Sequence, residues 1–259
     1  MNLNEFAQAL LKVKASDYNV PKEILGSGSW SSGQVGRALS RYAKGCKGED
    51  VLLLADTSGA FLPFNKFKEG IVVTKEALCS SELECGVNQT DKEIKEYGPV
   101  TAIPQPLYFA DLDYVSLDDN DKYGKLLVIT YKDGKKKQNA PGIYAKYIYE
   151  LLLLGMRFSR DQKWGIEGNT EKKEAAFFVE GRSVLKDAVV IFGTVGSQPL
   201  KCGDTLCLGS HKFRIDRFED LEAECFDSVE PDWMGNLYIE GEGANDLLIG
   251  DSLLMLEGK

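Results

Sequence analysis

Short apolar segments separated by glycine and polar breaks fill the middle of the chain. They lie at residues 51–55, 60–64, 71–74, 77–79, 107–117 and 125–131. Segments of this length between turn-forming residues are typical of β-strands. Asp133-Gly134 separates the last of them from a basic stretch at 135–138, and an Asp-Gly pair in this setting is a strong hairpin signal. The middle of the chain is therefore expected to consist mainly of strands.

The hydrophobic period becomes that of a helix at three places. Apolar residues recur at helical spacing between residues 3 and 13, and residues 35–43 suggest a second helix, capped by the Ser/Gly loop before it. Pro141 suits the first turn of a third helix, which continues through residues 143–158. Gly155 lies where the end of that helix is expected. The apolar face of the first helix is expected to dock on the neighbouring domain, and the alternative is that it binds a partner.

Short strands are also expected in the last third of the chain. The apolar or alternating segments lie at residues 188–195, 205–208, 212–215, 237–239 and 247–249. Gly-rich turns between short strands favour a barrel or a sandwich. Two Gly-Asp pairs, Gly203-Asp204 and Gly250-Asp251, are interpreted as structural. Glycine permits positive φ at a corner, and aspartate accepts hydrogen bonds from nearby amides.

The same region carries the phrase G-x-V-x-x-x-x-L-K-x-G-D between Gly193 and Asp204. It resembles the second domain of elongation factor Tu and its relatives, and the resemblance implies a small closed β-barrel. The GTPase that accompanies such a barrel is not expected, because no Gly-Lys pair of this chain is followed by Ser or Thr. Neither GTP nor another cofactor is therefore expected.

Two segments of the middle region resemble bacterial pleckstrin-homology-like domains. Residues 69–78 match a strand pair of those domains, and residues 109–115 match a later strand. The resemblance implies a β domain closed by one helix. Cys79 departs from it, because an aromatic residue usually occupies that position, and the polar stretch at 83–98 is interpreted as a long loop.

These observations predict a mainly β (α+β) protein with two β modules. The expected parts are an N-terminal helical segment at 1–47, a pleckstrin-homology-like domain with a closing helix at 48–158, a linker at 159–173 and an elongation factor Tu domain two-like barrel at 174–259. A chain of 259 residues is long enough to bury a core in each module.

Nearly all the excess negative charge lies on the expected barrel. Residues 172–259 contain 9 Lys/Arg and 17 Asp/Glu, a net charge of −8, whereas the whole chain carries −9. Such a surface repels phosphate groups. Nucleic acid is therefore not expected as a partner, although the corresponding domain of elongation factors works beside RNA.

Six cysteines are spread over the chain without a C-x-x-C pair, which is typical of reduced thiols in a cytosolic protein. A composite zinc site from Cys79, Cys85, Cys202 and Cys207 is a minor alternative, because the spacings of six and five residues within the pairs do not fit a zinc motif. The chain also shows no secretory signal and no apolar run of membrane-spanning length. We therefore expect a cytoplasmic location.

No catalytic signature is found, and neither catalytic residues nor a metal site is expected. The acidic run at 118–124 resembles a calcium loop, but Thr130 stands where a bidentate glutamate is required. A charged hairpin loop explains the run better. His211 is the single histidine and is expected in a solvated turn. An enzyme of unrecognised class is kept as a minor alternative.

A basic hairpin is the first candidate binding site. Its members are Lys132, Lys135, Lys136 and Lys137. In lipid-binding pleckstrin-homology domains such lysines hold headgroup phosphates, so a phospholipid- or phosphate-binding module is the alternative function. We expect instead that these lysines solvate the hairpin and protect an edge strand, and membrane binding is not expected.

Trp233 and Met234 form the second candidate site, inside a strongly acidic stretch. Large amphipathic side chains flanked by charge are typical interface anchors. The alternative is that Trp233 fills one end of the barrel. The function expected from the sequence is that of a non-catalytic cytosolic adaptor that binds a protein partner with a basic face.

Overall fold

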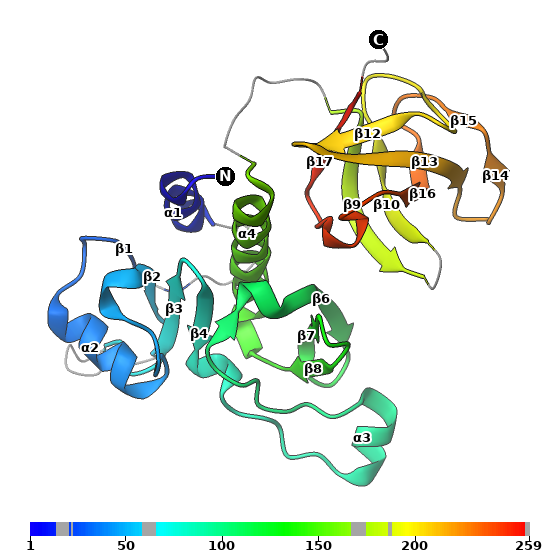
Figure 1. Ribbon diagram of the computed structural model, residues 1–259. Helices are drawn as coiled ribbons and strands as arrows, with labels where there is room; N and C mark the ends of the chain where they lie inside the picture. Colours follow the sequence, from blue (N-terminus) through cyan, green and yellow to red (C-terminus); the bar gives the residue numbers. More distant parts are fainter. Residues whose placement is uncertain (14–20, 22, 59–65, 167–174, 186–187, 257–259) are drawn as a thin grey trace. The chain divides into compact units, whose positions relative to one another are not determined.

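The computed structural model describes residues 1–13, 21, 23–58, 66–166, 175–185 and 188–256. The chain divides into two compact units, Met1–Arg160 and Asp161–Lys259 (Figure 1). The protein is mainly β with several sheets, as predicted. The α-helices of the described part are α1 (Leu3–Lys12), α2 (Ser32–Arg41), α3 (Asp91–Tyr97) and α4 (Ala145–Trp164). None of them combines the length and the apolar character needed to cross a bilayer.

Reciprocal capping explains where the first two helices begin. At α1, the Asn2 side chain accepts a hydrogen bond from the Glu5 amide (3.0 Å), and the Glu5 carboxylate accepts one from the Asn2 amide (2.9 Å). At α2, Ser31 and Gln34 exchange the same pair of bonds. These bonds satisfy amides that have no partner within the helix. The Ser/Gly loop therefore caps α2, as predicted.

α3 corrects the expectation of a long loop at 83–98. Thr90 caps this helix: its hydroxyl accepts from the Glu93 amide, and the Glu93 carboxylate accepts from the Thr90 amide (2.7 Å). Gly98 ends the helix with a φ of +75°. The stretch is polar because the helix is short and exposed, and its Thr-x-x-Glu sequence was a usable capping signal.

The strands of the first unit form two antiparallel sheets (Figure 1). The first is a five-stranded meander of β1 (Glu23–Gly26), β2 (Val51–Asp56), β3 (Gly70–Thr74), β4 (Ala77–Ser80) and β5 (Leu107–Tyr108). The second contains β6 (Leu112–Asn120), β7 (Gly124–Tyr131) and β8 (Lys136–Asn139). Strand β1 lies where the sequence predicts only helices. The hairpin at Asp133-Gly134 is confirmed, whereas residues 60–64 lie outside the described part.

Helix α4 continues past the end that Gly155 suggests. It runs to Trp164, so Gly155 lies in its interior. A Cβ atom at Gly155 would lie 2.2 Å from Cε1 of Phe109, which is buried. Glycine at this position permits close packing and does not end the helix. Residues 159–164 of the expected linker are helical, and residues 167–173 lie outside the described part.

Six strands of the second unit close into an antiparallel barrel (Figure 1). In the order of their pairing they are β12 (Thr205–Leu208), β17 (Ser252–Met255), β9 (Phe177–Val184), β10 (Val189–Val195), β16 (Met234–Glu240) and β13 (His211–Glu219). Strand β12 pairs with both β17 and β13, so the sheet returns on itself. Strand β14 (Cys225–Phe226) pairs with the end of β13, and β11 (Leu200–Lys201) pairs with β15 (Ser228–Val229). The predicted closed barrel is confirmed.

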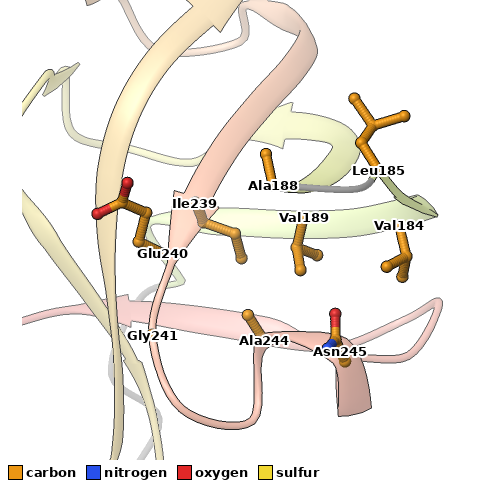
Figure 2. A pocket seen from close by; sticks show the side chains of 9 residues that line it. All are labelled: Val184, Leu185, Ala188, Val189, Ile239, Glu240, Gly241, Ala244 and Asn245. Atoms are coloured by element: carbon orange, nitrogen blue, oxygen red, sulfur yellow. The ribbon is translucent and has the colours of Figure 1, made fainter.

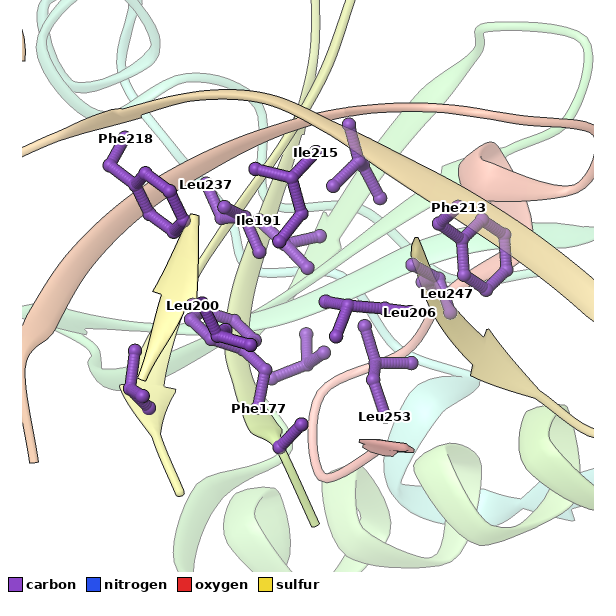
Figure 3. Packing of buried hydrophobic residues seen from close by; sticks show 14 of the residues in the cluster. Phe177, Ile191, Leu200, Leu206, Phe213, Ile215, Phe218, Leu237, Leu247 and Leu253 are labelled. Atoms are coloured by element: carbon purple, nitrogen blue, oxygen red, sulfur yellow. The ribbon is translucent and has the colours of Figure 1, made fainter. Parts of the chain in front are cut away.

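Large apolar side chains fill the interior of the barrel (Figure 3). Those that are at most 1% exposed include Phe177, Ile191, Leu200, Leu206, Phe213, Ile215, Phe218, Leu237, Leu247 and Leu253. Along β13, buried Phe213 and Ile215 alternate with the exposed Lys212 and Arg214. Successive side chains of a strand point to opposite faces, so this polar-apolar alternation directs one face of β13 into the core.

Both Gly-Asp pairs form corners, as predicted. Gly203 and Gly250 have φ values of +89° and +84°, a region that side chains disfavour. The carboxylate of Asp204 accepts a hydrogen bond from the Lys201 amide (2.9 Å). The carboxylate of Asp251 does the same for a backbone amide three residues earlier (2.7 Å).

The prediction of a strand at 247–249 is wrong. These residues follow the short helix η6 (Ala244–Asp246) and belong to no ladder. The amide of Leu248 bonds to the Asp251 carboxylate and not to a neighbouring strand. The segment is apolar because Leu247 belongs to the barrel core and Leu248 is also buried, and burial alone does not distinguish a loop from a strand.

Candidate functional site: a pocket on the barrel

A pocket of about 440 Å³ opens on the barrel, and we call it the barrel pocket (Figure 2). It is lined by Val184, Leu185, Ala188, Val189, Ile239, Glu240, Gly241, Ala244 and Asn245. These residues come from the end of β9 and the start of β10 with the residue next to each, from the end of β16 and from η6. Segments about 50 residues apart in the sequence therefore form one site.

Strand pairing sets the geometry of the barrel pocket. Val189 of β10 lies opposite Val184 of β9 on one side and opposite Ile239 of β16 on the other. The Leu185 amide donates to the Ala188 carbonyl (2.8 Å), which joins the end of β9 to the start of β10. Figure 2 shows Val184 and Val189 facing Ala244 across the pocket. The pairing of β9, β10 and β16 thus determines the positions of the apolar residues at the floor of the pocket.

The lining combines a buried apolar floor with an exposed apolar rim. Val189, Ile239 and Ala244 are each at most 8% exposed, whereas Val184 and Leu185 are 51% and 49% exposed. Glu240 and Asn245 are exposed and add a carboxylate and an amide. Among the described lining residues only Glu240 is titratable, so the arrangement suits binding of an apolar group beside a cation or a hydrogen-bond donor.

The four lysines of the basic hairpin lie together at the β7–β8 turn and are all exposed. Two of them have partners: Lys132 Nζ donates to the Ala110 carbonyl (2.8 Å), and Lys135 pairs with the Asp133 carboxylate (2.6 Å). The carboxylate raises the pKa of Lys135. Lys136 and Lys137 are the exposed first two residues of β8. Phosphate binding at this hairpin stays a prediction.

Trp233 and Met234 differ in their surroundings although they are adjacent. The Trp233 ring is half-buried, packs against the barrel core and meets the Phe218 ring edge-to-face, with centroids 5.7 Å apart. Met234 is 50% exposed at the start of β16. The barrel pocket uses the opposite end of the same strand, at Ile239 and Glu240. The structure therefore does not bring the two sites together, and partner binding at Trp233-Met234 stays a prediction.

His211 does not lie in a solvated turn. It begins β13, and its ring stacks on Trp164 with centroids 3.8 Å apart and an interplanar angle of 14°. The acidic run expected to be a hairpin loop covers the end of β6, the first residue of β7 and the three residues between them. Asn120 Oδ1 accepts from the amides of Lys122 and Tyr123. Within the described ranges, no three His, Cys, Asp or Glu side chains are arranged to hold a metal ion.

The sequence reading did not identify the barrel pocket. An apolar pair, Val184-Leu185, between Ser183 and Lys186 was the available signal, and such a pair is equally typical of a strand end. The partners in η6 become neighbours only through the register of β10 with β16, which the sequence pattern does not specify at this precision.

No protein-family model matches the chain, and no curated protein is significantly similar to it.

Proposed function

We propose that this protein is a non-catalytic binding protein that takes up a short segment of a protein partner in the barrel pocket. The observation that carries the proposal is the exposed apolar rim of Val184 and Leu185 above the buried floor. Exposed apolar side chains beside a concave surface are typical of binding sites. The segment would insert one large apolar side chain and place a Lys or Arg near Glu240.

The charge of the barrel supports a basic partner. Residues 172–259 carry a net charge of −8, which attracts a basic surface and accelerates encounter. Exposed ion pairs contribute only about 0–1 kcal/mol each, so most of the affinity has to come from apolar burial in the pocket. The same charge is our reason for proposing neither nucleic acid nor GTP as a ligand.

We further propose an origin for each unit. The barrel would be a relative of elongation factor Tu domain two, since the residues of the G-x-V-x-x-x-x-L-K-x-G-D phrase lie on β10, β11 and the corner before β12. The first unit would be pleckstrin-homology-like, because two antiparallel sheets precede the helix α4. A cytosolic location is part of the proposal, and the six free cysteines support it.

A peptide-display selection against the immobilised full chain tests the function. The proposal expects enriched peptides that combine a large apolar residue with Lys or Arg. Their capture should be lost with the double variant Val184→Gln/Leu185→Gln. Leu221→Gln is the matched control, because Leu221 is 77% exposed on the same unit and does not line the pocket. Failure to enrich any peptide, or equal loss with the control, refutes the proposal.

A further inference from the structure

Two cysteines of the first unit lie in direct contact. Cys46 follows α2 in the segment before the short helix η1 (Gly48–Asp50), and Cys79 lies on β4. Their Sγ atoms are 3.4 Å apart. A disulfide needs an S–S distance of about 2 Å, so the two atoms have to approach by little more than one ångström.

The two thiols differ in access to solvent. Cys79 is fully buried in an apolar cluster with Val72 and Phe67. Cys46 is half-buried and lines a cavity of about 190 Å³ together with Lys47, Lys75 and other residues. A small polar oxidant can therefore reach Cys46 from the cavity, whereas Cys79 is shielded.

The thiols also differ in acidity. The contact with Cys79 lowers the pKa of Cys46, although burial and the Asp50 carboxylate act in the opposite direction. The same contact, burial and nearby negative charge raise the pKa of Cys79. Cys46 is thus the more acidic thiol of the pair and the one that ionises more readily. Thiolates are the species that react with peroxides.

The backbone allows one thiol to move while the other is held. β4 pairs with β3 and β5, and Cys79 lies opposite Val72 in that ladder. Cys46 lies outside any helix or strand, and its amide bonds locally to the Ala43 carbonyl (3.2 Å). We therefore expect the Cys46 segment, and not β4, to move by the small distance that disulfide formation requires.

We propose that Cys46 and Cys79 form a peroxide-oxidisable dithiol site that closes to a disulfide. The Cys46 thiol loses its proton, and the thiolate attacks one oxygen of hydrogen peroxide. The O–O bond breaks, a sulfenic acid forms on Cys46, and the leaving hydroxide takes up the proton lost by Cys46 and departs as water. The Cys79 sulfur then attacks the sulfenic sulfur, the S–O bond breaks, and a second water leaves with the Cys79 proton. Two thiols are oxidised by two electrons, and one peroxide is reduced.

Peptide mapping after peroxide treatment tests the site. Trypsin places Cys46 in the peptide 45–47 and Cys79 in the peptide 76–92, which also contains Cys85. The full chain is therefore used with Cys85→Ser, a change at an exposed position. Stoichiometric hydrogen peroxide should join the two peptides with loss of two hydrogen atoms, and dithiothreitol should separate them again.

Two further variants separate the steps. Cys79→Ser should stop at the Cys46 sulfenic acid, which dimedone traps, and Cys46→Ser should give neither product. If Cys79→Ser does not fold, the proposal is still tested by the other two samples: the joined peptide should form in the Cys85→Ser chain and should be absent when Cys46→Ser is added. The proposal is overturned if both thiols remain open to alkylation while the exposed Cys225 has reacted. It is equally overturned if Cys46 proceeds to sulfinic acid without a joined peptide.

Discussion

Asp251 shows how a single buried carboxylate organises the barrel. It is 3% exposed, and its Oδ2 accepts from the Leu248 amide, which is itself buried. Without this acceptor the amide would lack a partner in an apolar setting, which is costly. The corresponding bond of Asp204 to Lys201 is exposed, so water replaces it there. The Gly-Asp pair therefore contributes more to the stability of the fold at Asp251 than at Asp204.

Asp251→Ala should lower the free energy of unfolding of the barrel by about 1–3 kcal/mol, because it leaves a buried amide unsatisfied. Asp204→Ala, the matched control at the exposed corner, should cost less than about 1 kcal/mol. Urea unfolding followed by tryptophan fluorescence measures both. An equal loss of unfolding free energy in the two variants would contradict the conclusion that burial makes the Asp251 hydrogen bond the more important one.

Glu82 links stability of the first unit to pH. Burial raises its pKa above the ordinary value, although the Thr57 hydroxyl donates to it at 2.6 Å and acts in the opposite direction. The folded state then holds this proton to a higher pH than the unfolded state, so stability falls as pH rises through and above about 4.5.

Glu82→Gln should therefore gain stability relative to the wild type as pH rises from about 4 to 7. Glu84→Gln, at an exposed position two residues along, serves as the control and should show a smaller change. Thermal unfolding at several pH values provides the measurement. A wild type that becomes more stable than Glu82→Gln towards pH 7 would reverse the predicted sign.

At the scale of elements, the sequence predicted what depends on local chemistry. The hairpin at Asp133-Gly134 and the Ser31 cap of α2 are such features, because neighbouring residues alone determine them. The end of α4 was not predictable, since Gly155 is a stop signal by propensity and a packing position by tertiary contact with Phe109. The barrel pocket was missed for a related reason: its two sides meet only through strand register.

Two helix glycines give opposite expectations for the same substitution. Gly155→Ala should destabilise the first unit by about 1–3 kcal/mol, because the new Cβ meets the buried Phe109 ring. Gly36→Ala in α2 meets nothing within 4 Å and should stabilise by about 0.5–1 kcal/mol through lower backbone entropy of the unfolded chain. Thermal unfolding compares them, and stabilisation by both variants contradicts the packing role of Gly155.

At the scale of the whole molecule, charge and apolar surface have separate roles in the proposed binding. The net charge of −8 over residues 172–259 acts at long range and steers a basic partner. The barrel pocket acts at contact, where burying one large apolar side chain contributes about 1.5–3 kcal/mol. Added salt should therefore slow association with a basic partner but leave the apolar contribution to the binding free energy unchanged.

The most direct test is a fluorescence-anisotropy titration of a display-enriched basic-apolar peptide with the full chain at low and at physiological salt. We expect saturable binding that salt weakens. Val184→Gln/Leu185→Gln should weaken it about tenfold or more, and Leu221→Gln should leave it unchanged. Glu240→Gln should reduce the salt dependence. Binding that is equal in the double variant and the wild type would contradict the central claim.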